Sequence, residues 1–382
     1  MKASMLVPEY VPGAPSGLMV HVEGLLEGIK DADVTIYARS KVDDPRIHAV
    51  APAPVGPYLA ELLGGDRTAR FMANITAYNL AAYHAALEEP TDLVHAHDWL
   101  GAIAAPALAE AKSVPFLLTL HSTEQGRSLG AGSPQLAKLE RRAVEAADLV
   151  VVASEFMAQE ARDQGCPGEK IRHVAHGLPI RDIASAPAMS TKDIRHSMGL
   201  GDAPLAVFIG RIAKPKGCRE LLSAFSLAAR KVDDCQLVFA GSGPDAENLK
   251  ANAKAKGLAS RIHFIQQTLD LPHKWGLMDA ADVVVLPSIY EPFGVVALEA
   301  MARGRPVLVS SLGGCAELVE DEVSGLVRDP RDRYVFGESL TELLANRERG
   351  IAFGKAALER AGRFDRTAMC EGTLAVYREL AK

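Results

Sequence analysis

The chain has few cysteines, few aromatic residues, no excess of positive charge and no long apolar run. Its five cysteines form no CxxC pair, and an odd number fits a disulfide framework badly, so we expect reduced thiols in a cytoplasmic protein. The net charge of −6 gives no basic surface for nucleic acid or for an anionic membrane. No stretch reaches the roughly 18 apolar residues of a spanning helix, and the N-terminus resembles no signal peptide. These absences predict neither a nucleic-acid partner nor a transmembrane segment.

Short apolar runs alternate with longer amphipathic stretches along 382 residues, which suggests two domains at roughly 150 residues each. The first series predicts strands at 3–7, 34–37, 93–96, 116–120, 149–153 and 171–174. The second predicts strands at 205–209, 236–240, 262–265, 283–286 and 307–310. Strand–helix alternation favours a parallel sheet covered on both faces. We therefore predict an α/β fold of two doubly wound domains, 1–178 and 204–363, joined by an aperiodic linker at 179–203.

Polar residues follow several predicted strands of the first domain, where ligands of open α/β sheets bind. Gly17 opens a helix, so its backbone can approach an anion near the positive helix end. His95 and His97 are two residues apart, so their side chains share one face of the predicted strand. A metal site needs a third ligand, and none is evident nearby, so a cluster of polar side chains that contacts a ligand is favoured. Asp98 follows directly. His121 comes immediately after the strand at 116–120 and points to the same edge.

Cations and glutamates follow the strands of the second domain. Arg211 and Lys216 lie in the glycine-bounded loop 210–217, which suits a diphosphate. Glu291 and Glu299 flank a turn into a helix, roughly 10 Å apart by helix rise. That span fits the sugar and ribose ends of one nucleotide sugar, with the turn amides of residues 293 and 294 facing a phosphate between them. The spacing predicts a nucleotide-sugar site.

Three other patterns in the sequence are typical of other kinds of active site. Residues 126–130 match GxSxG, but the preceding strand ends near residue 120, too early for a nucleophile elbow. Residues 241–246 match GxGxxA, yet Gln266 and Gln267 stand where a dinucleotide site needs an acidic residue. Residues 31–33 form a DxD signature before a strand, at the wrong edge of the sheet for a site. None of the three is favoured over the nucleotide-sugar interpretation.

Taken together, these segments resemble the GT-B retaining glycosyltransferases of family 4, with features of the glycogen and starch synthases. The resemblance covers nearly the whole chain. It rests on the Glu291-to-Glu299 spacing, the loop 210–217, the SLGG run at 311–314 with Glu317, and the HAHDW run at 95–99. It implies two tandem Rossmann-like domains that face each other across a cleft, with a last helix within 364–382 returning to the first domain.

The resemblance also implies a role for each matching residue. Arg211 and Lys216 would neutralise the leaving diphosphate, which the backbone at Gly17 would approach from the first domain. Glu291 would contact the donor hexose and Glu299 its ribose. The remaining contacts would come from four residues: His121 and Asp98 at the transferred sugar, and Phe293 and Gly294 at the donor.

The implied reaction is retaining transfer of a hexose, with glucose favoured, from a nucleotide-diphosphate sugar to a carbohydrate acceptor by front-face displacement. No cofactor and no metal would be required. The sequence departs from the family at 176–179, where His-Gly-Leu-Pro replaces Asn-Gly-Val-Asp, and at 14–18. Alternatives are an ADP- or UDP-glucose-dependent α-glucan synthase, a nucleotide-sugar epimerase on the same scaffold and a nicotinamide-dependent oxidoreductase.

Overall fold

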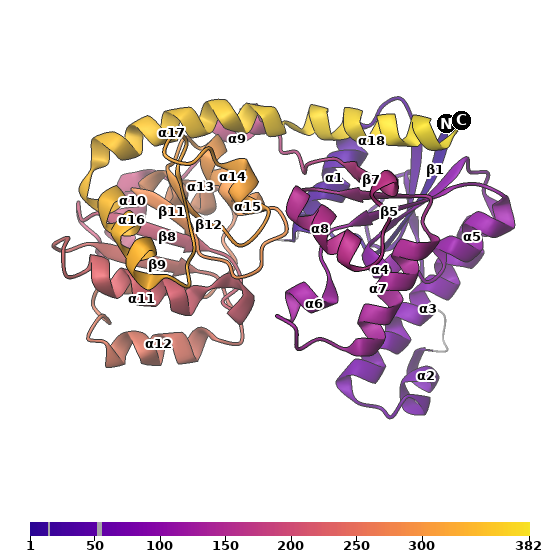
Figure 1. Ribbon diagram of the computed structural model, residues 1–382, viewed down its shortest axis with the longest axis horizontal. Helices are drawn as coiled ribbons and strands as arrows, with labels where there is room; N and C mark the ends of the chain where they lie inside the picture. Colours follow the sequence, from indigo (N-terminus) through magenta and orange to yellow (C-terminus); the bar gives the residue numbers. More distant parts are fainter. Residues whose placement is uncertain (14–15, 52–55) are drawn as a thin grey trace. The chain divides into compact units, whose positions relative to one another are not determined.

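The computed structural model describes residues 1–13, 16–51 and 56–382 (Figure 1). The chain divides into two compact units. The first comprises Met1–Gly177 and Arg366–Lys382, and the second comprises Leu178–Asp365.

Seven strands, all parallel, form the sheet of the first unit. They are β1 (Lys2–Glu9), β2 (Asp33–Arg39), β3 (Ile47–Ala49), β4 (Leu93–His97), β5 (Phe116–Leu120), β6 (Leu149–Val152) and β7 (Ile171–His173). Their order is β3-β2-β1-β4-β5-β6-β7. Strands β2 and β3 lie on one side of β1, and the chain then continues with β4 on the other side of β1. Doubly wound sheets bind ligands beyond the carboxyl ends of the strands at such a reversal, which here are β1 and β4.

The helices of the first unit cover both faces of its sheet. They are α1 (Gly17–Gly28), α2 (Gly56–Leu62), α3 (Arg67–Glu88), α4 (Asp98–Gly101), α5 (Ala105–Lys112), α6 (Glu124–Arg127), α7 (Pro134–Ala146), α8 (Glu155–Asp163) and α18 (Arg366–Leu380). Alternate residues of β5 enter different cores: Phe116 and Leu118 pack on one side, and Leu117 packs on the other. Because successive side chains point to opposite faces of the sheet, this strand is buried on both faces, as is usual for a central parallel strand.

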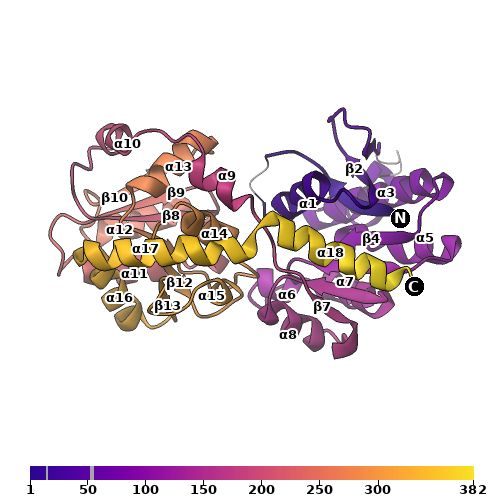
Figure 2. The same cartoon turned by 90° about the horizontal axis from the view of Figure 1, so that it is seen from above.

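Helix α18, the C-terminal helix, packs beside α1 on one face of this sheet (Figures 1 and 2). The Cys370 thiol lies 3.4 Å from the carbonyl oxygen of Gly24 in α1. A β-carbon at Gly24 would lie 2.8 Å from the terminal methyl group of Met369, so the glycine makes room for this side chain between the two helices. The buried Tyr377 hydroxyl lies 2.8 Å from His95 Nδ1. The last helix is thus anchored to β4 by a polar contact as well as by packing.

Six parallel strands form the sheet of the second unit. They are β8 (Leu205–Ile209), β9 (Gln236–Ala240), β10 (Ile262–Ile265), β11 (Val283–Leu286), β12 (Val307–Ser310) and β13 (Leu326–Arg328), in the order β10-β9-β8-β11-β12-β13. Strands β9 and β10 lie on one side of β8, and the chain then continues with β11 on the other side. The carboxyl ends of β8 and β11 are therefore the expected ligand-binding position of this sheet.

The helices of the second unit include two that the sequence does not predict. Its helices are α9 (Ile180–Ser185), α10 (Thr191–Ser197), α11 (Cys218–Ala228), α12 (Ala246–Ala255), α13 (Leu271–Ala280), α14 (Val295–Ala302), α15 (Cys315–Leu318), α16 (Arg333–Ala345) and α17 (Arg347–Ala361). Helices α9 and α10 occupy the segment 179–203, expected as a linker. Ile183 and Ile194 are buried, and Ser190 Oγ accepts the Asp193 amide as an N-cap. The segment is therefore part of the second unit.

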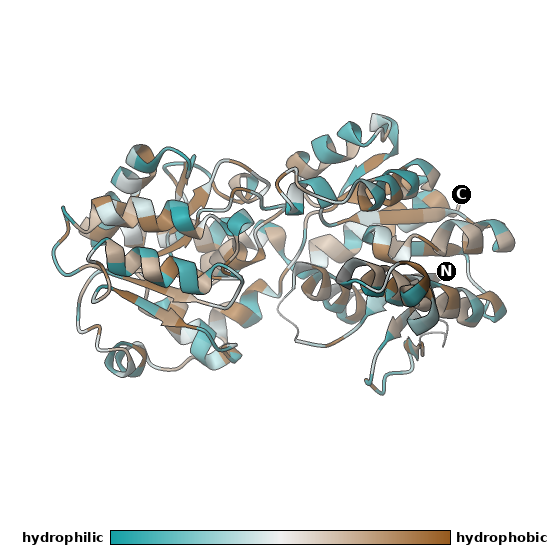
Figure 3. Ribbon diagram, turned by 90° about the horizontal axis from the view of Figure 1, so that it is seen from below, coloured by the Kyte–Doolittle hydropathy of each residue, from teal (hydrophilic) through white to brown (hydrophobic). Residues whose placement is uncertain are grey.

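The strands of both sheets consist mainly of hydrophobic residues, whereas the helices contain both hydrophobic and hydrophilic residues (Figure 3). Among the described residues, no helix is both long enough and apolar enough to cross a membrane.

Candidate functional site

The loop that carries Lys216 is fixed to the exit of β11. The amides of Ile289 and Tyr290 donate to the Pro215 carbonyl oxygen at 2.8 and 3.1 Å. Gly217 has a φ of +65°, and a β-carbon there would lie 1.8 Å from the Pro287 carbonyl oxygen. Only glycine satisfies both conditions. The backbone therefore holds the β8 and β11 exits together, which places Lys216 beside the turn that follows β11.

Lys216 and Glu291, predicted separately from two motifs, form an ion pair. Lys216 Nζ lies 2.7 Å from Glu291 Oε2, and the Ser288 hydroxyl donates to the same oxygen at 3.1 Å. Arg211 is exposed, and no partner for its guanidinium is found within the described part of the chain. The structure thus brings a cation and a carboxylate together at the switch point, with a second cation on the same loop.

Glu299 lies in the second turn of α14, and its carboxylate is buried. Lys274 Nζ, from the first turn of α13, contacts Glu299 Oε1 at 2.6 Å. The other oxygen, Oε2, is buried and finds no hydrogen-bond partner among the described residues. Since buried acceptors in native proteins are normally satisfied, this oxygen is a candidate for a ligand hydroxyl. Sequence reasoning missed Lys274, because its link to Glu299 exists only in three dimensions.

The turn between the two glutamates is held by the SLGG run. Gly314 donates its amide to the Glu291 carbonyl oxygen at 2.8 Å, and a β-carbon at Gly313 would lie 2.4 Å from that oxygen. Gly294 has a φ of +102° and faces the β-carbon of Cys315. The Phe293 ring is buried edge-on against Phe364, with centroids 6.0 Å apart. The ring is therefore part of the core, and only the backbone of this residue is suited to meet a ligand.

The glycines of the GxGxxA pattern serve packing. A β-carbon at Gly241 would lie 2.0 Å from the Gly210 carbonyl oxygen, and one at Gly243 would lie 2.2 Å from the Ile212 carbonyl oxygen. These glycines let the exit loop of β9 lie directly on the exit loop of β8. The pattern thus supports the loop that carries Arg211, without a dinucleotide site.

We expect Gly217→Ala to destabilise the second unit far more than Gly257→Ala. Gly257 has a similar φ of +71° but open space around its α-carbon. Both variants carry the left-handed backbone penalty of about 1–2 kcal/mol, and only Gly217→Ala adds a clash with backbone. Its unfolding free energy should fall by more than about 4 kcal/mol. Chemical denaturation of both variants measures the difference, and equal losses would contradict the close approach of the two loops.

Four histidines meet at the corresponding edge of the first unit. His97 ends β4, His121 follows β5, His176 follows β7, and His21 lies on the buried face of α1. His97 Nδ1 and His121 Nε2 are 2.8 Å apart, as are the Nδ1 atoms of His21 and His176. The rings of His97 and His121 stack at 5.1 Å between centroids, and the His21 ring lies edge-on to both. Sequence reasoning gave no role to His21 or His176, although both follow predicted strands.

Burial keeps these imidazoles neutral. It lowers the pKa of His21, His97 and His121 well below the ordinary value and that of His176 to about 4. His95 lies on the same face of β4 as His97, but its two ring nitrogens already contact Tyr377 and Thr119. His95 is therefore structural, whereas the other four form a compact neutral group.

Asp98 holds the exit loop of β5. Its Oδ1 accepts the amides of His121 at 2.7 Å and Ser122 at 3.4 Å. Burial raises the pKa of Asp98 to about 6, and the nearby Arg127 guanidinium opposes that rise. Arg127 also pairs with the buried Glu140 at 2.9 Å. Asp98 thus positions His121, and its contacts in this structure are made to protein backbone.

Gly17, expected to approach an anion, is the exposed first residue of α1. Ser16 Oγ accepts the Met19 amide at 3.1 Å and caps the helix. Residues 14 and 15 of the same predicted turn lie outside the described residues.

The remaining sequence patterns belong to other parts of the fold. In the GxSxG run, Ser128 donates to the Glu124 carbonyl oxygen at 2.6 Å, downstream of the end of β5. Asp31 and Asp33 of the DxD run lie at the amino end of β2, opposite the exit loops. Both positions differ from the ones that catalytic versions of these motifs require.

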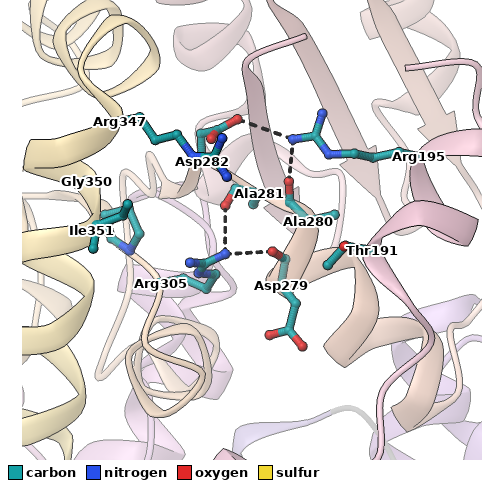
Figure 4. A pocket seen from close by; sticks show the side chains of 11 residues that line it. Thr191, Arg195, Asp279, Ala280, Ala281, Asp282, Arg305, Arg347, Gly350 and Ile351 are labelled. Carbon is teal, nitrogen blue, oxygen red and sulfur yellow. Dashed lines mark hydrogen bonds and ion pairs between the residues drawn. The ribbon is translucent and has the colours of Figure 1, made fainter. Parts of the chain in front are cut away.

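A polar cavity of about 180 Å³ lies elsewhere in the second unit (Figure 4). Asp282, one of its lining residues, directly precedes β11. Its amide donates to the Leu205 carbonyl oxygen at the start of β8, and its Oδ2 accepts the Leu205 amide, so the cavity lies at the amino ends of the strands. Arg195 donates to the Ala280 carbonyl oxygen at 2.7 Å, and Arg305 to that of Asp279 at 2.6 Å. Arg195 thus links α10 to the end of α13, and Arg305 links the α14–β12 connection to the same helix, so both guanidinium groups already make structural hydrogen bonds.

Comparison with known proteins finds relatives that match along both units. Residues 15–181 match Glycosyltransferase Family 4, and residues 190–360 match Glycosyl transferases group 1. The glycogen synthase of Mycobacterium tuberculosis is 30% identical, covering 99% of this chain and 94% of that protein. The alpha-maltose-1-phosphate synthase of Mycolicibacterium smegmatis is 28% identical over the full length of both.

Solved structures share the fold at lower identity. Sucrose-phosphate synthase of Thermosynechococcus elongatus gives a TM-score of 0.81 at 22% identity, covering 99% of this chain and 98% of that one. Anabaena HepE, solved with UDP and glucose, gives 0.78 at 19% identity over the full length of both. With its two Rossmann-like sheets and its full-length relatives, the chain belongs to the GT-B glycosyltransferases of family 4 and is a glycosyltransferase.

Proposed function

We propose that this glycosyltransferase moves a hexose, glucose, from a nucleoside-diphosphate sugar to a carbohydrate acceptor with retention of configuration. One observation carries the proposal: the Lys216–Glu291 pair lies on loops at the β8/β11 switch point, and helix α14, which follows the same turn, carries the unpartnered Glu299 oxygen. A diphosphate needs cations, and a ribose and a hexose need acceptors for their hydroxyls. The second unit supplies both kinds of group at one edge of its sheet.

The reaction requires charge stabilisation more than acid–base catalysis. As the bond between the sugar C1 and the phosphate oxygen breaks, negative charge grows on the diphosphate, and Lys216 and Arg211 stabilise it. The acceptor hydroxyl attacks C1 on the face that the phosphate leaves. Its proton passes to the departing phosphate oxygen while the new C1–oxygen bond forms. No nucleophile–acid pair of carboxylates is assigned, in contrast to a retaining glycosidase.

For the donor contacts we assign Glu299 to the ribose hydroxyls and Glu291 to the hexose, with the backbone of Phe293 and Gly294 toward the phosphates. In the first unit we assign His121 to the transferred sugar, positioned by Asp98, and the backbone at Gly17 to the diphosphate. These assignments follow the family resemblance, and the carboxylate environments described above are compatible with them.

The acceptor is the less defined substrate. The named relatives include a glycogen synthase and an alpha-maltose-1-phosphate synthase. Glucosyl transfer to a glucan end would extend the glucan, and transfer to glucose 1-phosphate would give maltose 1-phosphate. We therefore propose both acceptors for testing, with α-glucan synthesis from ADP-glucose or UDP-glucose as the second candidate function.

A panel of nucleotide sugars tests the proposal. ADP-, UDP- and GDP-sugars are scored for an increase in Tm and for release of nucleoside diphosphate with either acceptor. The proposal expects one donor to do both. A donor epimerised without any acceptor would favour the epimerase alternative, and an absorbance change with NAD would favour the oxidoreductase.

We expect activity to survive EDTA, since side chains and helix ends supply the positive charge at the diphosphate. Activity is measured before and after chelation and again after adding Mn²⁺. Loss with chelator and recovery with Mn²⁺ would contradict the metal-independent mechanism and redirect attention to the DxD run at 31–33.

A further inference from the structure

We propose that His21, His97 and His121 of the first unit bind one divalent ion of the zinc class. One ring nitrogen of each lies within 4.8 Å of one ring nitrogen of the other two. The three residues come from α1, β4 and the β5 exit, so the third ligand that the sequence did not reveal near His97 is supplied by other elements.

Three buried nitrogens in this cluster lack a protein partner. His21 Nε2, His97 Nε2 and His121 Nδ1 are buried and have no hydrogen-bond partner among the described residues. The side chains are buried as well, with residue exposures of 1%, 0% and 7%. A buried nitrogen without a partner is costly, and one cluster that holds three of them points to a ligand.

The donor set selects the kind of ion. Imidazole nitrogens suit Zn²⁺, Cu²⁺ and Ni²⁺, whereas Mg²⁺ and Mn²⁺ prefer oxygen ligands. The Oδ1 atom of Asp98, which follows His97 in the chain, accepts the amides of His121 and Ser122. A divalent ion binds the neutral form of imidazole through a ring nitrogen.

A fourth histidine, His176, orients the ring of His21. His176 Nδ1 lies 2.8 Å from His21 Nδ1, so this contact leaves His21 Nε2 as the ring nitrogen free for an ion. Metal-bound histidines commonly use their second nitrogen in this way. Three protein nitrogens also leave the fourth position of a tetrahedral ion for water or a substrate oxygen.

Occupancy has a consequence that rests on the proposed function. If His121 contacts the transferred sugar, an ion bound to its ring removes that contact. Zinc should then inhibit glycosyl transfer in the concentration range in which it fills the site, while Mg²⁺ has no effect. The ion is therefore a regulator of the reaction and takes no part in it.

Equilibrium dialysis against Zn²⁺ followed by metal analysis tests the binding without reference to activity. Wild-type protein should hold one tightly bound ion per chain, and His97→Gln and His121→Gln should each lose it. His84→Gln is the matched control, because His84 is an exposed histidine of the same unit. At a hundredfold excess over Kd, Zn²⁺ should raise the wild-type Tm by about 5–10 °C.

Co²⁺ provides a readout that does not depend on the variants. Bound to wild-type protein, it should give the intense visible absorption of a four-coordinate site, even if a histidine variant fails to fold. Absence of a bound ion in wild-type protein, or binding that persists in both cluster variants, would overturn the proposal. If wild-type protein binds zinc but its metal-free form shows no transferase activity, the metal site stands and the result counts against the proposed function alone.

Discussion

Lys216→Ala is expected to lower kcat by about thirty- to a thousandfold. That range corresponds to about 2–4 kcal/mol of lost transition-state stabilisation, the cost of removing a preorganised group at a developing negative charge. In the structure Lys216 is half-buried and held against Glu291 at 2.7 Å, so its ammonium is already positioned before a donor binds. Arg211→Ala should also lower kcat, by a smaller factor because Arg211 is exposed.

Lys214→Ala is the matched control for both variants. Lys214 is an exposed lysine of the same short turn, Lys214–Lys216. Its removal changes the net charge equally and should leave kcat near the wild-type value. Steady-state kinetics with saturating donor, together with Tm for each variant, separates catalysis from folding. Unchanged turnover in both Lys216→Ala and Arg211→Ala would contradict the assignment of these cations to the leaving group.

Glu299→Gln and Glu291→Gln are expected to change different kinetic constants of the reaction. Contacts of equal strength in the ground and transition states affect KM, whereas contacts that strengthen in the transition state affect kcat. Glu299 is assigned to ribose hydroxyls, so its substitution should raise the donor KM by about ten- to a hundredfold with a modest change in kcat. Glu291 is assigned close to the reacting carbon, so its substitution should lower kcat more strongly.

The surrounding ion pairs make a stability control necessary. Each glutamate contacts a lysine, Glu299 with Lys274 and Glu291 with Lys216, so either variant can also affect folding. Glu338→Gln removes an exposed glutamate that pairs with Lys231 and should change neither kinetic constant. If both site variants lose stability but keep wild-type KM and kcat, the two glutamates have only a structural role and the donor-site assignment is wrong.

Much of the fold was predictable from the sequence because parallel strands are buried on both faces. The strand expected at 116–120 is β5 with the same bounds, and those at 205–209 and 236–240 are β8 and β9. The short edge strands β3 and β13 were not predicted, since three residues carry too little periodicity. The sequence predicts a linker where α9 and α10 lie, because these short helices pack through a few buried isoleucines and show no long amphipathic pattern.

The parts of the candidate site that lie within one continuous sequence motif were predictable. The parts that form by contacts between distant segments were not. The loop 210–217 and the spacing from Glu291 to Glu299 indicate a donor site by their residue types and separations alone. The Lys216–Glu291 pair required the pairing of β8 with β11. The histidine cluster required four elements that lie far apart in the sequence. A run of residues can show that His97 follows a strand, but only the sheet order shows which side chains lie beside it.

The most direct test of glycosyl transfer at this site is proton NMR of one reaction mixture containing the donor selected by the panel and its acceptor. Anomeric signals report donor loss, product formation and product configuration together. The account predicts that an α-linked donor is consumed only with acceptor, that nucleoside diphosphate appears in equal amount, and that the new linkage is α. A β-linked product, or no consumption of any nucleotide sugar by folded protein, would contradict it.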